Sequence, residues 1–181
     1  MKQQVKCCYG ISSKVEKNGH VIMFDFDGVS YDHVVNYLDS VMKEYDFSDF
    51  YIIKSEHGYN AICLDIIPLS LIYSIGIAIE SPADRNFFVY GFKRNYLVLR
   101  FDNDKALLGV LKNDSRKYEK SMAHKMFLEW FFDIRITDSN FNDITKLNII
   151  QYPSNKNGYH LQDKEIPETW LYYRGDKNFD K

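Results

Sequence analysis

One apolar segment constrains the fold of this chain more than any other feature. Residues 20–27 (HVIMFDFD) are mostly apolar, β-branched or aromatic, and Gly28 ends the run, which is typical of a buried strand closed by a turn. Behind two possible N-caps, Ser30 and Asp32, the apolar residues between positions 34 and 45 recur at helical spacing. The sequence therefore predicts a strand followed directly by an amphipathic helix.

The next segments predict the remaining elements of a small mixed domain. Residues 50–55 (FYIIKS) and 59–66 (YNAICLDI) are strand-like and flank a short turn, so we expect an antiparallel hairpin. A helix is predicted over 69–80, and two strands over 87–90 and 95–101, paired across a turn at 91–94. The order β-α-β-β-α-β indicates an α+β fold of the ferredoxin-like or RRM-like kind, an antiparallel sheet with helices on one face.

The rest of the chain adds fewer regular elements. A helix is predicted over 115–134, as a C-terminal helical extension of the sheet, and short strands over 5–9 and 147–152. We expect residues 1–136 to form a single α+β domain and residues 137–181 to form a partly irregular C-terminal extension.

Composition excludes several classes of protein. The chain has 181 residues, 45% hydrophobic side chains and a formal net charge of −2, which excludes wholesale disorder and a histone-like binder of nucleic acid, although a local basic groove stays open. Three cysteines are too few for a disulfide framework, and the sequence has neither a signal-peptide pattern nor an apolar run of about 18 residues. We expect a reduced, cytoplasmic protein that does not enter a membrane.

Two acidic residues end the strand at 20–27. Residues i and i+2 of a strand share a face, so Phe24 and Phe26 point to the core while Asp25 and Asp27 stand together on the other face. Neighbouring carboxylates repel each other unless a cation lies between them, and hard oxygen ligands suit Mg²⁺ or Mn²⁺. The alternative is a strand end at which two acids meet solvent.

The hairpin turn gathers groups that can hold a phosphate. Ser55 supplies a hydroxyl, His57 an imidazole and Gly58 an unhindered backbone N–H, with Asn60 close behind. The alternative is a polar turn with an incidental histidine.

A third group lies further along the chain. Asp84 is a possible third metal ligand, and Arg85, Arg94 and Arg100 fall within 16 residues of one another in a chain with six arginines. Arginine is the fork-shaped binder of phosphates. The alternative is a turn at Asp84 with ordinary solvated arginines.

The strand ending in Asp25-Phe26-Asp27, the helix and the hairpin YIIKSEHGYNAICLD resemble the archaeo-eukaryotic primase (primase-polymerase) superfamily, including its plasmid and viral members. The resemblance covers about residues 18–105. Ser55 and His57 match the Ser-x-His form of the second motif of that family. If Gly58 instead belongs to the Gly-x-His form, Asn60 stands where the family has histidine. Asp84 is the choice for the third acidic motif, and Asp102 is the fallback.

The resemblance implies nucleotidyl transfer on a single-stranded template. Asp25, Asp27 and Asp84 would be the catalytic residues and would hold Mg²⁺ or Mn²⁺. Ser55, His57 and Arg85 would hold the nucleoside triphosphate. The wider nucleotide-binding set that it implies is Ser55, His57, Gly58, Asn60, Arg85, Arg94 and Arg100. The implied partners are nucleoside triphosphates, a single-stranded template and a helicase or accessory replication subunit.

Two other functions stay open. One is a catalytically inactive RRM-like module for nucleic-acid binding or assembly. The other is a phosphatase, because FDFDGV also resembles the first motif of haloacid-dehalogenase-type phosphatases, in which the first aspartate is the nucleophile. Such a phosphatase has a parallel sheet, so the direction of the strands beside residues 20–27 separates these readings.

Overall fold

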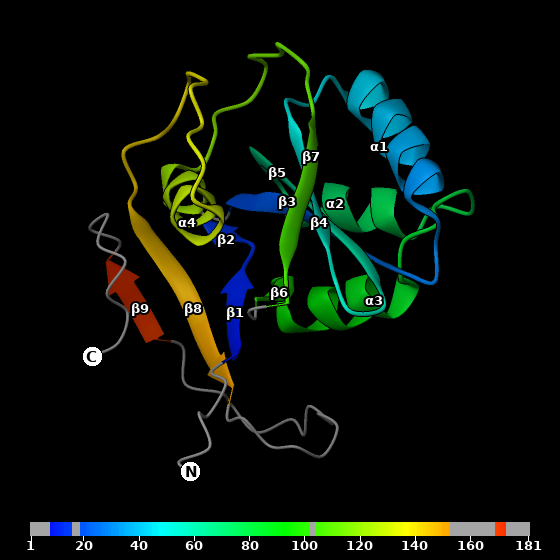
Figure 1. Cartoon of the computed structure of the whole chain (residues 1–181), viewed down its shortest axis with the longest axis horizontal. Helices are drawn as coiled ribbons and strands as arrows, with labels where there is room; N and C mark the ends of the chain where they lie inside the picture. Colours follow the sequence, from blue (N-terminus) through cyan, green and yellow to red (C-terminus); the bar gives the residue numbers. More distant parts are fainter. Residues whose placement is uncertain (1–7, 16–18, 102–103, 153–168, 173–181) are drawn as a thin grey trace.

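The computed structural model describes residues 8–15, 19–101, 104–152 and 169–172 (Figure 1). Their fold is α+β, with four helices, one five-stranded sheet and one four-stranded sheet, and all paired strands run antiparallel. In chain order the elements are β1 (Cys8–Ser12), β2 (Lys14–Val15), β3 (Gly19–Asp27), α1 (Tyr31–Tyr45), β4 (Phe50–Lys54), β5 (Gly58–Ile67), α2 (Leu69–Gly76), α3 (Arg85–Arg94), β6 (Val98–Phe101), β7 (Ala106–Leu111), α4 (Met122–Phe132), β8 (Lys146–Tyr152) and β9 (Thr169–Tyr172).

The five-stranded sheet has the order β2-β3-β5-β4-β7. Strands β3 and β4 each run antiparallel to β5, which lies between them, so β3 and β4 are parallel and α1 is the crossover that joins them. This is a split β-α-β unit. The predicted strand at 20–27, the helix after it and the β4–β5 hairpin are all confirmed.

The aromatic face of β3 anchors the core. Phe24 and Phe26 are fully buried, and the Phe24 ring lies 5.9 Å from Tyr37 of α1 and 5.6 Å from Phe88 of α3, between ring centroids. Helices α1 and α3 therefore pack on the same face of β3. Ser30 caps α1 by accepting a hydrogen bond from the His33 N–H at 3.3 Å, as the sequence predicts.

The strand predicted at 87–90 is wrong, because these residues lie inside helix α3. The Asp84 side chain caps this helix by accepting from the Asn86 N–H at 3.0 Å, and Asn95 ends it in the left-handed conformation. Packing explains the difference from the local pattern. Phe88 lies so close to Gly76 of α2 that a Cβ there would overlap its ring. The predicted turn at 91–94 is likewise part of the helix.

Two predicted helices are shorter in the structure. The helix expected over 69–80 ends at Gly76, and Ile79, which lies beyond its end, is 99% exposed. The helix expected over 115–134 spans Met122–Phe132, because Ser121 caps it by accepting from the His124 N–H at 3.4 Å.

The four-stranded sheet, with the order β6-β1-β8-β9, corrects the expected layout in one respect. Strand β6, which an RRM-like sheet would place beside β3, pairs with β1 instead. The region after residue 137 also contributes β8, which confirms the strand predicted at 147–152, and β9. Figure 1 shows β8 and β9 on the side of α4, away from α1. Residues 5–7 of the predicted strand 5–9 lie outside the described residues.

Two buried histidines lie where β1, β2 and β3 meet α4. Ser13 accepts from the Leu97 N–H at 2.9 Å, so its hydroxyl proton is free to donate to His20 Nδ1, 3.0 Å away. His124 Nε2 lies 2.8 Å from the Ser12 carbonyl oxygen and therefore carries a proton, which leaves Nδ1 to accept from the Ser121 hydroxyl at 2.7 Å. In both histidines Nδ1 accepts a hydrogen bond, so both imidazoles are neutral in the folded chain.

Among the described helices, none combines the length and the apolar character needed to cross a bilayer.

Candidate metal centre

Three carboxylates converge at the end of β3. Asp25, Asp27 and Asp84 each offer an oxygen, and these oxygens all lie within 4.8 Å of one another. Strand alternation puts Asp25 and Asp27 on one face, as predicted. Asp84 arrives from the edge of β3 that β2 leaves uncovered, where its N–H donates to the Asp25 carbonyl oxygen at 2.7 Å. The three residues that were predicted as metal ligands therefore lie together.

The donor set fits a small divalent cation. Carboxylate oxygens bind Mg²⁺ at about 2.0–2.1 Å, so two opposite ligands of one ion lie about 4.2 Å apart. The oxygens of Asp25, Asp27 and Asp84 lie within 4.8 Å of one another. Only one pair among three ligands of an octahedral ion can be opposite, so the other pairs would close to about 2.9 Å when the ion binds. These residues could hold Mg²⁺ or Mn²⁺, each supplying one hard oxygen ligand.

Burial and like charge act on Asp25. They raise its pKa to about 6, with burial as the largest cause, followed by repulsion from Asp27. Asp84 also raises this pKa, whereas Lys105 and a hydrogen bond from Asn60 lower it. At neutral pH the folded chain therefore carries a carboxylate whose ionisation costs free energy.

Asn60 is the polar residue closest to Asp25 across the sheet. The two are register partners in β3 and β5, and Asn60 Nδ2 donates to Asp25 Oδ1 at 2.7 Å. Lys105 Nζ in turn donates to Asn60 Oδ1. Asn60 is only 3% exposed. The hydrogen-bonded series Lys105–Asn60–Asp25 is therefore a fixed part of the site.

Lys105 is the member of this site that the sequence interpretation missed. It lies 80 residues after Asp25 and just before β7, which is brought to the site by pairing with β4. The order of strands in the sheet is the only signal that could have found it, because no local motif marks the residue.

The hairpin turn lies against the end of β3 through its backbone. The Gly28 N–H donates to the His57 carbonyl oxygen at 3.2 Å, and the Ser55 N–H donates to the Gly58 carbonyl oxygen at 3.0 Å. The His57 side chain is 78% exposed and lies 3.7 Å from the Glu56 carboxylate. Asn60, rather than His57, is thus the turn-side residue in contact with the acids.

Gly58 is required for the close approach of β5 to β3. A Cβ at this position would overlap the carbonyl oxygen of Phe26, a backbone atom that cannot rotate away. We expect Gly58→Ala to lower the free energy of unfolding by about 1–3 kcal/mol, as overpacking does, measured by urea denaturation.

Gly109→Ala is the matched control for that substitution. A Cβ at residue 109 would meet only the Tyr31 hydroxyl, at 3.3 Å, which is the far end of an exposed side chain. Equal losses of stability in the two variants would contradict the role assigned to Gly58.

The three arginines do not gather at the acids. Arg85 directly follows Asp84 as the first residue of α3 and is exposed, whereas Arg94 is the last residue of that helix, about 14 Å further along its axis. Arg100 is exposed on β6, in the other sheet. Of the predicted set, only Arg85 adjoins the triad in the chain. Asp102, the alternative third acid, lies outside the described residues.

No family model, curated protein or solved structure matches this chain. The candidate site therefore stands on its own geometry.

Proposed function

We propose that this chain is a metal-dependent nucleotidyltransferase that synthesises nucleic acid on a single-stranded template, in the manner of primase-polymerases. The observation that carries the proposal is the convergence of Asp25, Asp27 and Asp84 at one end of an antiparallel sheet. We propose further that β3, α1, β4 and β5 form the RRM-like part of the fold, with the acids at the end of its first strand.

Each group at the site has a part in this proposal. Bound Mg²⁺ or Mn²⁺ would make the attacking 3′-hydroxyl more acidic and would stabilise the leaving pyrophosphate. The three aspartates supply its ligands. In this proposal the Ser55 hydroxyl, His57 and Arg85 contact the triphosphate. Lys105 adds positive charge beside Asn60 and offsets part of the negative charge of the three aspartates.

A primer synthesis and extension assay tests this function. Wild-type protein, a single-stranded template, nucleoside triphosphates and Mn²⁺ are expected to give a product, and the double substitution Asp25→Ala/Asp27→Ala is expected to lower the rate at least about 100-fold, since metal catalysis supplies several kcal/mol. Asp39→Ala is the matched control, because Asp39 is an acid on α1 whose partner is the exposed Lys43. Absence of product from the wild type would end the proposal.

A second candidate function is a non-catalytic RRM-like binding or assembly module. The chain of Lys105, Asn60 and Asp25 favours it, because a lysine then compensates some of the negative charge that a metal ion would neutralise. Titration with Mn²⁺ separates the two candidates. Saturable binding that is lost in Asp27→Asn supports the transferase, whereas no binding supports the module.

The strand directions argue against the phosphatase alternative. A haloacid-dehalogenase-type enzyme needs parallel neighbours beside its first strand, whereas β3 runs antiparallel to both β2 and β5.

A further inference from the structure

Aromatic rings and cations alternate around the C-terminal end of α3, where Tyr90 and Lys93 are exposed and Lys14, Arg94 and Tyr96 are partly buried. Lys93 Nζ lies 5.8 Å from the centroid of the Tyr90 ring, and the Arg94 guanidinium carbon and Lys14 Nζ each lie 5.9 Å from the centroid of the Tyr96 ring. We call Lys14, Tyr90, Lys93, Arg94 and Tyr96 the basic-aromatic patch.

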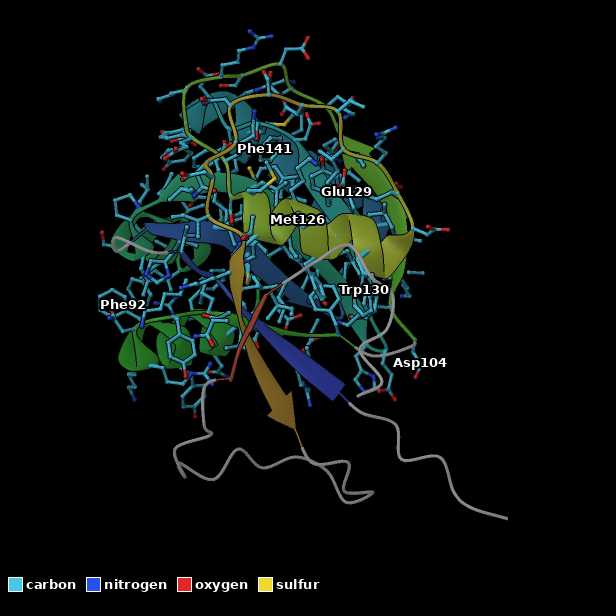
Figure 2. All side chains as sticks on the ribbon, turned by 90° about the vertical axis from the view of Figure 1, so that its left-hand side faces the viewer. Phe92, Asp104, Met126, Glu129, Trp130 and Phe141 are labelled. Atoms are coloured by element: carbon cyan, nitrogen blue, oxygen red, sulfur yellow. The ribbon has the colours of Figure 1, made fainter. Side chains whose placement is uncertain are left out.

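The fold holds these five residues on one continuous surface. Tyr90, Lys93 and Arg94 lie at i, i+3 and i+4 of α3 and so share a face of the helix. Lys14 is tied to Tyr96 through their neighbours, because Ser13 and Leu97 exchange hydrogen bonds of 2.8 and 2.9 Å. Tyr90 is 59% exposed, and its ring is open to a ligand. Phe92, labelled in Figure 2, lies at the outside of the molecule on the same helix.

The charge around the patch is one-sided. Residues 85–101 contain four basic side chains and no acidic one, although the whole chain has a formal net charge of −2. Such a segment attracts anions locally. Phosphate groups are therefore the complementary ligand for the cations, and flat bases are the complementary ligand for the tyrosines.

We propose that the basic-aromatic patch binds single-stranded nucleic acid, with lysine and arginine contacting phosphates and Tyr90 stacking on a base. A membrane surface fits less well, because an interfacial helix presents a broad apolar face, whereas the rings here alternate with cations. Unpaired bases expose the faces that stacking requires, so a single strand fits better than a duplex.

This inference rests on the proposed function, in which the patch would bind the template strand. Helix α3 begins directly after Asp84 and ends at Arg94, so a strand bound at the patch can run along α3 toward the three carboxylates. The binding itself requires no metal. It can therefore be measured in the presence of EDTA, where failure of the patch and failure of the metal centre are separate results.

The experiment is fluorescence anisotropy with a labelled oligothymidylate in EDTA. Saturable binding is expected, weakened about tenfold by Tyr90→Ala and restored by Tyr90→Phe, which keeps the ring. Lys93→Gln is expected to weaken binding and to reduce the slope of log affinity against log salt by about 0.7, as loss of one phosphate contact does. Lys43→Gln, which removes an exposed lysine on α1, is the matched control and should leave affinity unchanged.

Three results would overturn the proposal. One is no binding of the oligonucleotide by the wild type. Another is binding that Tyr90→Ala, Lys93→Gln and Lys43→Gln change equally, which would indicate general charge attraction. The third is tighter binding to vesicles of phosphatidylglycerol than to the oligonucleotide, lost in the same two patch variants, which would assign the patch to a membrane surface.

Discussion

Replacing Asp25 with asparagine is expected to raise the free energy of unfolding of the metal-free protein at pH 8 by about 3 kcal/mol and, in the same variant, to abolish Mn²⁺ binding and nucleotidyl transfer. The reason is the raised pKa of Asp25, about 6 in the folded chain against 3.8 for the ordinary side chain. Each pKa unit corresponds to about 1.4 kcal/mol. A metal ligand can thus be removed with a gain in stability.

The sign follows from proton linkage. Between pH 3.8 and 6 the folded chain holds a proton on Asp25 that the unfolded chain has released, so the contribution of this residue to stability falls as the pH rises through that range. Above pH 6 the full cost of the buried charge is present. Asparagine carries no charge, and its amide oxygen can still accept from Asn60 Nδ2, as Asp25 Oδ1 does at 2.7 Å.

Urea denaturation at pH 8 in EDTA checks the stability, and titration with Mn²⁺ checks the metal site. Asp39→Asn is the control, because this acid is partly exposed and pairs with Lys43 on the surface of α1; its effect should be small. If Asp25→Asn were less stable than the wild type at pH 8, the claim that the ionised Asp25 carboxylate destabilises the fold would be wrong. Undiminished Mn²⁺ binding would remove Asp25 from the metal centre.

Acidification from pH 8 to pH 5 is expected to lower the free energy of unfolding by about 3 kcal/mol through two buried histidines. Burial, the largest cause, lowers the pKa of His20 and of His124 from 6.5 to about 4. In this pH range the unfolded chain binds protons on both rings and the folded chain does not, so stability falls with the pH. Protonation of Asp25 in the folded chain offsets part of the loss.

The hydrogen bonds of His20 and His124 explain why the folded chain does not protonate these rings readily. Each Nδ1 accepts from a serine hydroxyl, Ser13 for His20 and Ser121 for His124, within a buried junction. After burial, Lys14 also lowers the pKa of His20, and the neighbouring His20 also lowers the pKa of His124.

Urea denaturation at a series of pH values measures this dependence. His124→Gln is expected to remove about half of the histidine contribution to the slope of unfolding free energy against pH between 5 and 6.5, whatever its own effect on stability at pH 8. His33→Gln is the control, because His33 is exposed on α1. Identical slopes for the wild type and His124→Gln would show that the buried histidines do not cause the pH dependence of stability.

Local patterns were sufficient for the first half of the fold. Alternation along residues 20–27 buries Phe24 and Phe26 and leaves Asp25 and Asp27 together on the other face. Helix α1 and the β4–β5 hairpin could be predicted equally well. The spacing of apolar residues and the turn between two strands depend on neighbours in the chain. Two of the three candidate metal ligands could be placed together in this way.

Tertiary structure decided the rest. Residues 87–90 are aromatic and β-branched enough to predict a strand, with a turn over 91–94, yet the cap at Asp84 and the contact of Phe88 with Gly76 make residues 85–94 a helix. Only that helix start, bonded to the edge of β3, brings Asp84 to the other two acids.

The sequence by itself thus determined which side chains share a face of β3, since strand alternation is a property of the backbone. It did not determine that Lys105 reaches Asn60 or that β1 and β8 share a sheet. Those contacts join segments 45 or more residues apart in the chain. They depend on which strands pair, and pairing is selected by the packing of the whole core rather than by any local pattern.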